Sequence, residues 1–397
     1  MKTSFLAATL LALAATPALA QVDLTDTPLA YRYFHRVGAD LATHDAELVD
    51  CLRKGAQTVT MSQAMRRQKY YYVDLQDLTE WTITGALTSA QQRQNVLLNA
   101  ENCMVVKGWD VVTVSDALGA KLMKLTPAEV ANDFLAQRVG QPVVTGGIIR
   151  SWGNDAANPE TERFGTGPRI AAKPLLSLKA LDPQRLRDGI ARPWPKPFDN
   201  KMPDTAKPRL LGAGQVAGIP PGSAVIVTRL KGVGSGAGTG FTFERVGADP
   251  DVPAWAADGR VAAFQISQSS LAGKPEGKFF AIVAPPGEWR LASMGVLPLL
   301  NFCLGSPSFQ VKAGEILFAG TFDMGGMPFK PDMEMIAARQ FLKARPDLAE
   351  QLKPAVWTNG STGRCGDSVI YAIEFDGAPF AEGYVDGGAR KAEPATP

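Results

Sequence analysis

The first twenty residues indicate the compartment in which the rest of the chain folds. Met1-Lys2-Thr3 is a short positive start, and residues 4–15 are almost wholly apolar. Pro17 follows, and Ala18-Leu19-Ala20 places small residues three and one positions before a cut. This order is typical of a bacterial secretory signal peptide, cleaved here after Ala20. We therefore expect a periplasmic or secreted protein.

The alternative for this segment is a membrane anchor. The apolar run covers only residues 4–15, whereas a transmembrane helix needs roughly 20 residues. A later apolar stretch, residues 292–304, is interrupted by Gly295, Pro298 and Asn301. No Cys follows directly after Ala20, which argues against a lipid anchor. We expect no membrane span.

The chain contains four cysteines: Cys51, Cys103, Cys303 and Cys365. An even number in an exported chain favours disulfides, because the compartment is oxidising. Three pairings are possible, and we favour chain order, Cys51 with Cys103 and Cys303 with Cys365. The alternative is four buried free thiols. Because no Cys-x-x-Cys spacing occurs, we expect neither a thioredoxin-like redox pair nor a zinc knuckle. We expect no metal and no cofactor in this chain.

Length and charge set further limits. The composition, 45% hydrophobic and 20% charged residues, is that of an ordinary globular chain. A formal net charge of +2 gives no basic surface for nucleic acid. Removing 20 of 397 residues leaves 377, enough for two or three domains. The oligomeric state is not predicted by these features.

Residues 21–140 are predicted to form a mostly helical module that one disulfide, Cys51 with Cys103, holds together. Thr126-Pro127-Ala128-Glu129 is a capping box that starts a helix. We expect a helix from about 89 to 108 around Cys103, and a second one around Cys51 that Gly55 ends. Short strands are expected at 70–73 and 109–114.

Residues 141–221 differ in composition, with 12 of the 29 prolines. Twelve basic and seven acidic residues give this stretch a net charge of +5 (12 − 7). We expect a proline-rich linker, or a strap laid over a neighbouring domain. The alternative is a docking segment for an aromatic groove, centred on 192–197.

Residues 222–388 are predicted to form a β-sandwich with a helical insertion at about 332–353, followed by a flexible tail at 389–397. Runs rich in Val, Ile, Phe and Thr are separated by regular turn signals, which favours a sandwich. The expected strands are 223–230, 240–246, 262–267, 279–284, 288–291, 309–312, 315–322 and 368–375. The fold class expected for the whole chain is α+β.

Two short segments resemble elements of known exported proteins. Pro285-Pro286-Gly287-Glu288-Trp289, together with the run from Phe309 to Gly320, resembles a transthyretin-like sandwich of uncharacterised bacterial envelope proteins. The resemblance covers residues 279–322, and it implies a fold without carrying over a catalytic residue. The residues from Glu101 to Trp109 are similar to a Cys-Met-x-x-Lys-Gly-aromatic element of small exported proteins.

Several chemistries are disfavoured. His35 and His44 lie nine residues apart, on opposite sides if one helix holds both, which does not suit a shared metal. We expect each to be a surface or partly buried residue. A His-based catalytic triad is disfavoured, because no Gly-x-Ser-x-Gly motif occurs and most candidate nucleophiles lie in another domain. The absence of Ser-x-x-Lys removes a site of the penicillin-binding type. The alternating glycines at 232–240 precede a strand, so we predict a hairpin loop rather than a phosphate site. Asn359-Gly360 is predicted to be a turn.

Carboxylates offer the remaining route to catalysis. Paired acids hydrolyse glycosidic bonds when they lie about 5 to 10 Å apart, and the candidates here are Asp323, Asp332, Glu334, Asp367 and Glu374. Solvated charge at strand ends is the simpler explanation. We therefore expect a non-enzymatic periplasmic binding or envelope-associated interaction protein, whose partner is an envelope protein or polymer. The alternative is a carboxylate-dependent hydrolase that acts on envelope polymers.

Overall fold

A computed structural model of the chain contains both helices and sheets, as expected for an α+β protein. It describes residues 31–67, 90–152, 175–181, 208–211, 220–231, 239–246, 263–268, 277–295, 300–323, 330–363, 365, 369–384 and 386. The predicted signal peptide, the strand at 70–73, the proline run at 192–197 and most of the glycine loop lie outside these residues. Among the described helices, none combines the length and the apolar character that crossing a membrane requires.

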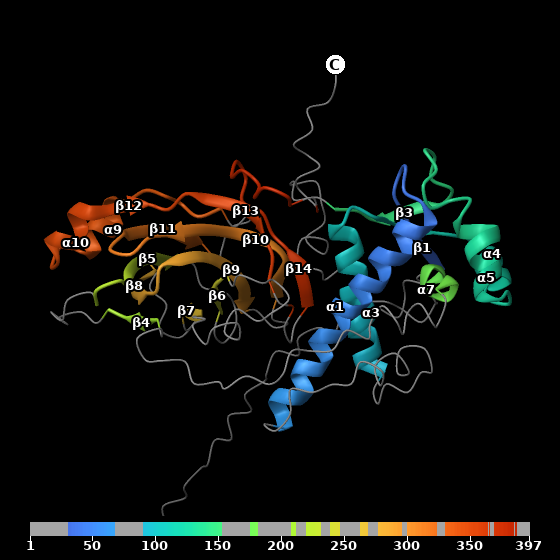
Figure 1. The fold of residues 1–397 in the computed structure, drawn as a ribbon, viewed down its shortest axis with the longest axis horizontal. Coiled ribbons are helices and arrows are strands. Elements are labelled where there is room, and N and C mark those ends of the chain that lie inside the picture. The colour runs from blue at the N-terminus through green and yellow to red at the C-terminus, as the bar shows by residue number, and fades with distance from the viewer. Residues whose placement is uncertain are drawn as a thin grey trace, which may run out of the picture.

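Helices α1 (Leu41–Arg67) and α3 (Ala90–Val106) pack against each other beside the two larger sheets (Figure 1). The prediction that Gly55 ends the first helix is wrong, since α1 continues to Arg67. A Cβ atom at position 55 would lie 2.6 Å from the carbonyl oxygen of Val96 in α3. Gly55 is therefore a point of close approach between two helix backbones rather than a terminator.

A small antiparallel sheet completes this helical part, with strand order β1 (Arg32–His35), β2 (Asp110–Thr113), β3 (Gly147–Arg150). Strand β2 confirms the strand predicted at 109–114. The capping box is also present: Thr126 starts α5 (Pro127–Glu129), which continues as a π-helical turn over Val130–Leu135. Two further short helices among the described residues are α4 (Asp116–Leu122) and α7 (Leu176–Ala180).

Most strands of the C-terminal part lie in two larger sheets. The six-stranded sheet has the order β13-β10-β9-β6-β7, with β14 parallel to β10, and the five-stranded sheet has the order β12-β11-β5-β8-β4. The strands are β4 (Arg209–Leu210), β5 (Ala224–Lys231), β6 (Thr239–Arg245), β7 (Ala263–Gln268), β8 (Lys278–Ala284), β9 (Gly287–Gly295), β10 (Leu300–Val311), β11 (Ile316–Asp323), β12 (Leu352–Pro354), β13 (Trp357–Ser361) and β14 (Val369–Ala372).

One apolar cluster draws side chains from both of these sheets. Phe243 and Trp289 reach it from the six-stranded sheet, and Ile226 and Leu317 reach it from the five-stranded sheet. The turn at 285–286 connects β8 of one sheet to β9 of the other, and the turn at Gly314 connects β10 to β11 in the same way. These turn signals therefore mark changes of sheet, and neither closes a hairpin.

Helices α9 (Ile336–Phe341) and α10 (Pro346–Gln351) lie between β11 and β12, within the range predicted for a helical insertion. Their buried side chains form a second apolar cluster with the five-stranded sheet. Val225 and Phe318 belong to this cluster, whereas their strand neighbours Ile226 and Leu317 belong to the first. The five-stranded sheet is thus apolar on both faces.

The predicted turn at Asn359-Gly360 is wrong, because both residues lie inside β13. The Asn359 side chain donates to the carbonyl groups of Phe375 and Ala378 and accepts from the amide of Phe375. Gly360 has a φ of +90°, and a Cβ there would lie 2.5 Å from the Tyr384 ring. The Asn-Gly pair here anchors a neighbouring loop to a strand.

The described parts of the proline-rich stretch belong to both halves of the molecule. Strand β3 pairs with β2, α7 packs into the helical core, and β4 pairs with β8. In the parts that the structure describes, residues 141–221 therefore contribute the edge strands β3 and β4 and the short helix α7.

Candidate functional site

Of the carboxylates considered for catalysis, Asp332 and Glu334 have local structural roles. Asp323 is exposed at the end of β11, and Glu374 is partly buried beyond β14. Asp332 pairs with Thr321 through two backbone hydrogen bonds, and its carboxylate accepts from the amide of Glu334. The Glu334 carboxylate accepts from the amide of Ile336 at the start of α9. Asp367 lies outside the described residues.

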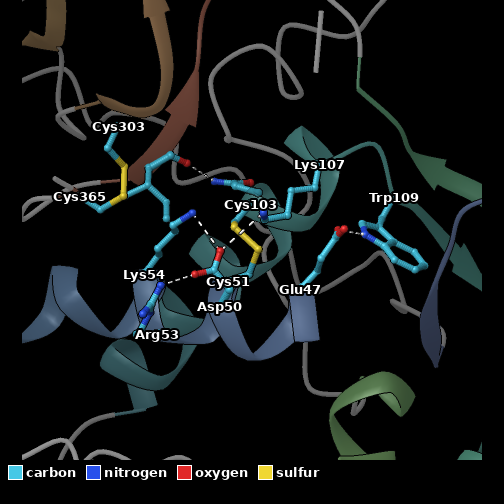
Figure 2. The surroundings of a disulfide bond; sticks show 12 residues. Glu47, Asp50, Cys51, Arg53, Lys54, Cys103, Lys107, Trp109, Cys303 and Cys365 are labelled. Atoms are coloured by element: carbon cyan, nitrogen blue, oxygen red, sulfur yellow. Dashed lines mark hydrogen bonds and ion pairs between the residues drawn. A yellow bond between two sulfur atoms is a disulfide. The ribbon is translucent and has the colours of Figure 1, made fainter. Parts of the chain in front are cut away.

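Both disulfides and several buried polar side chains lie instead near the junction of α3 and β14. The structure joins Cys51 to Cys103 and Cys303 to Cys365, the pairing favoured by chain order. The first bond ties α1 to α3, and the second ties β10 to the segment before β14. Figure 2 shows the two disulfides on neighbouring elements, and all four cysteines belong to one buried cluster.

Asp50 and the Cys51–Cys103 pair have ligand atoms within 4.8 Å of one another, a spacing that could hold a metal ion. The chemistry does not fit, because disulfide sulfurs are not thiolates. The Asp50 carboxylate is bound by Arg53, by Lys54 at 2.9 Å and by Lys107 at 3.6 Å (Figure 2). Burial raises the pKa of Asp50, but these cations outweigh burial and hold the pKa below its ordinary value of 3.8.

The segment from Glu101 to Trp109 supplies much of this junction. Cys103 forms the disulfide, Lys107 binds Asp50, and Gly108, with a φ of +82°, follows the end of α3. The Trp109 indole N–H donates to Glu47 at 2.6 Å (Figure 2). The residues that resemble an element of small exported proteins therefore hold α1, α3 and β2 together.

A buried ionic cluster lies next to this segment. Glu101 in α3 accepts from Arg32 Nε in β1 at 3.2 Å and from Arg150 in β3 at 2.8 Å. Arg150 also donates to the Asn102 side-chain oxygen at 2.9 Å. The side chains of Arg32, Glu101 and Arg150 are at most 2% exposed. Charges this deeply buried require partners, which explains the number of hydrogen bonds.

Two asparagines of α3 bind the β14 backbone. Asn102 donates to the carbonyl of Ile370, and Asn99 accepts from the Ile370 amide, both at 3.1 Å. Strand β14 lies directly beside α3 in Figure 1. Because these bonds are buried and specific in geometry, they fix the helical part on the edge of the six-stranded sheet.

The expectation that each histidine is a surface or partly buried residue is wrong, and the two do not share a helix. His35 lies in β1 and His44 in α1, and both are almost wholly buried. His35 Nε2 donates to the Gln141 carbonyl at 2.8 Å, and its Nδ1 lies 3.8 Å from the Asp110 carboxylate. Burial raises the pKa of Asp110, and the nearby His35 opposes that rise.

His44 bridges a carboxylate and a hydroxyl. Its Nδ1 contacts Asp45 and its Nε2 contacts the Ser177 hydroxyl, both at 2.9 Å. This is the bonding order of a catalytic triad. However, Ser177 and His44 are 0% exposed, and the Ser177 oxygen also accepts from the Phe34 amide at 3.0 Å. We interpret the arrangement as a buried link that holds α7 on α1 and β1.

Sequence reasoning missed the pairing of His44 with Ser177, the role of Arg32 and Arg150, and the anchoring of β14. The nearest signal was the short element around Cys103, which contains Glu101 and Asn102. Comparison of the chain with protein-family models, with curated proteins and with solved structures gave no match. The roles given to the residues around α3 and β14 therefore follow from their contacts in the structure alone.

Proposed function

We propose that this chain is an exported, non-enzymatic binding protein that acts in the periplasm by contacting an envelope protein. The signal-like segment before Gln21 supports export. The two disulfides support an oxidising compartment, because cytosolic thiols are kept reduced.

The proposal includes a β-sandwich as the scaffold. The apolar cluster shared by the two larger sheets supports it, as do the turns that cross from one sheet to the other. A transthyretin-like relationship is part of the proposal as well, on the strength of residues 279–322. Such a scaffold offers loops and strand edges for contact with partners.

The observation that carries the proposal is the edge of the small sheet. Strand β3 is an edge strand in the order β1-β2-β3 of the described residues. Ile148 in this strand is 51% exposed, and Val143 shortly before it is 76% exposed. An edge strand with exposed apolar side chains suits an extended polypeptide segment that pairs with it. The partner proposed is therefore a protein with such a segment.

The hydrolase remains the alternative, and it requires two convergent acids in a pocket. Asp332 and Glu334 are instead engaged by backbone amides at the start of α9. Turnover of an envelope polymer that is lost in Asp323→Asn or Glu374→Gln, with folding intact, would favour this alternative over the binding function.

The binding function is tested by crosslinking in intact cells followed by purification of the tagged chain. We expect a crosslinked protein with the wild type and its loss in the Val143→Lys/Ile148→Lys double variant, because lysines block edge pairing. Ile336→Lys is the matched control, since Ile336 is 76% exposed on α9. Equal capture by all three proteins, or capture of a glycan polymer alone, would contradict the proposal.

A further inference from the structure

The buried ionic cluster is not electrically balanced. Arg32 and Arg150 each carry a positive charge, and within the described part of the chain Glu101 is the one carboxylate that both contact. The three side chains together carry a net charge of +1 (2 − 1). Because all three are at most 2% exposed, water screens this charge poorly.

The hydrogen bonds of the cluster are incomplete in a specific way. Arg32 uses only Nε toward Glu101, and its two terminal nitrogens are buried without a hydrogen-bond partner among the residues that the structure describes. Arg150 Nε and the indole nitrogen of Trp152, two residues further along, are also buried without a hydrogen-bond partner among the described residues. All four atoms are N–H donors, and none of them can accept. What they lack is an acceptor.

We propose that the terminal guanidinium nitrogens of Arg32 bind a small monovalent carboxylate, of formate or acetate size, enclosed between β1, α3 and β3. One negative charge balances the excess positive charge. Two oxygens in a plane match the paired nitrogens of the guanidinium group. Burial of Arg32 limits the ligand to a few atoms. Water fits less well, since it brings no charge and also donates.

The fold holds this guanidinium group in place. Strand β1 pairs with β2 on one side, and Arg32 itself bridges to Leu175 on the other. Glu101 fixes Arg32 Nε and is in turn held by Arg150, whose other terminal nitrogen binds Asn102. A site positioned before the ligand arrives loses little conformational freedom on binding. The inference does not depend on the proposed envelope partner, because it concerns the interior of the helical part.

The test is a thermal unfolding and calorimetric titration of the purified protein, with sodium formate and sodium acetate replacing sodium chloride at constant ionic strength. We expect a rise in Tm and one-site binding for the wild type. Arg32→Lys keeps the charge but loses the paired nitrogens, so binding should weaken at least tenfold. Arg339→Lys, an exposed arginine on α9, should behave as the wild type.

Equal binding by wild type and Arg32→Lys, or no rise in Tm above that in chloride, would overturn the inference. If Arg32→Lys does not fold, a crystal structure of the wild type grown with formate decides. Formate density at the two terminal nitrogens of Arg32 supports the site, and water or chloride there rejects it.

Discussion

The side chain of Asn102 donates a hydrogen bond to the carbonyl of Ile370, 268 residues further along the chain. The same side chain accepts from Arg150, so one residue connects β3, α3 and β14. Neither bond reaches solvent, because Asn102 is fully buried. The two halves of the molecule therefore meet through specific polar contacts as well as through apolar packing.

Replacing Asn102 with Ala should destabilise the protein by about 1–3 kcal/mol, because the Ile370 carbonyl and an Arg150 nitrogen each lose a buried partner. Urea unfolding measures this change. The exposed Gln351 also donates to a backbone carbonyl, and Gln351→Ala should change stability by less than about 0.5 kcal/mol. Equal effects of the two substitutions would contradict the role given to Asn102.

Each disulfide should contribute measurably to stability. The bonds join residues 52 and 62 positions apart, and the chain-entropy model gives about 4 kcal/mol for loops of this length. We expect the double substitution Cys303→Ala/Cys365→Ala to lower the free energy of unfolding by about 2–5 kcal/mol. A non-reducing digest should yield two linked peptides, Cys51 with Cys103 and Cys303 with Cys365. Any other pairing would be inconsistent with the fold.

Ser177→Ala should lower stability by about 1–3 kcal/mol, since His44 and the Phe34 amide both lose a buried partner. Faster hydrogen exchange of the Phe34 amide is the local readout. We also expect no labelling of Ser177 in the wild type by a fluorophosphonate, because its hydroxyl is fully buried. Labelling that depends on His44 would instead identify a catalytic serine.

Acid should destabilise the protein partly through Asp50. Its pKa is lower in the folded protein than the ordinary value of 3.8, so folding favours the ionised form. This contribution is fully present well above pH 3.8 and is lost as the pH falls below that value and through the folded pKa. Asp50→Asn should therefore lower the free energy of unfolding at pH 7. It should also make the fall of that free energy below pH 5 less steep. An unchanged pH profile in urea titrations would show that Asp50 does not contribute.

Gly55→Ala should destabilise the protein even though Ala is the better helix former. The added Cβ would meet the Val96 carbonyl oxygen at 2.6 Å and force α1 and α3 apart. We expect a net loss of about 1–3 kcal/mol. Gly147→Ala at the exposed start of β3, where the atom nearest to an added Cβ lies 3.2 Å away, is the control and should cost less stability. A gain in stability from Gly55→Ala would mean that the two helices pack less closely.

Local signals determined much of the secondary structure. The capping box at Thr126 fixes a helix start through hydrogen bonds between residues three apart, so the sequence alone predicts it. The runs rich in Val, Ile and Phe likewise predicted β5, β8 and β11, because β propensity and apolar pattern are short-range properties. The cysteine count, together with the expected compartment, favoured the pairing that the structure has.

Tertiary structure alone decided what these elements face. Gly55 and Gly360 are typical terminator and turn residues, yet each accommodates a group from a distant segment. His44 and Ser177, 133 residues apart, form a side-chain hydrogen bond that no local sequence pattern predicts. The excess positive charge around Arg32 arises only where three elements converge. The physical reason is common to all of them: propensity acts over a few residues, whereas burial, charge balance and close approach depend on residues that only the folded chain brings together.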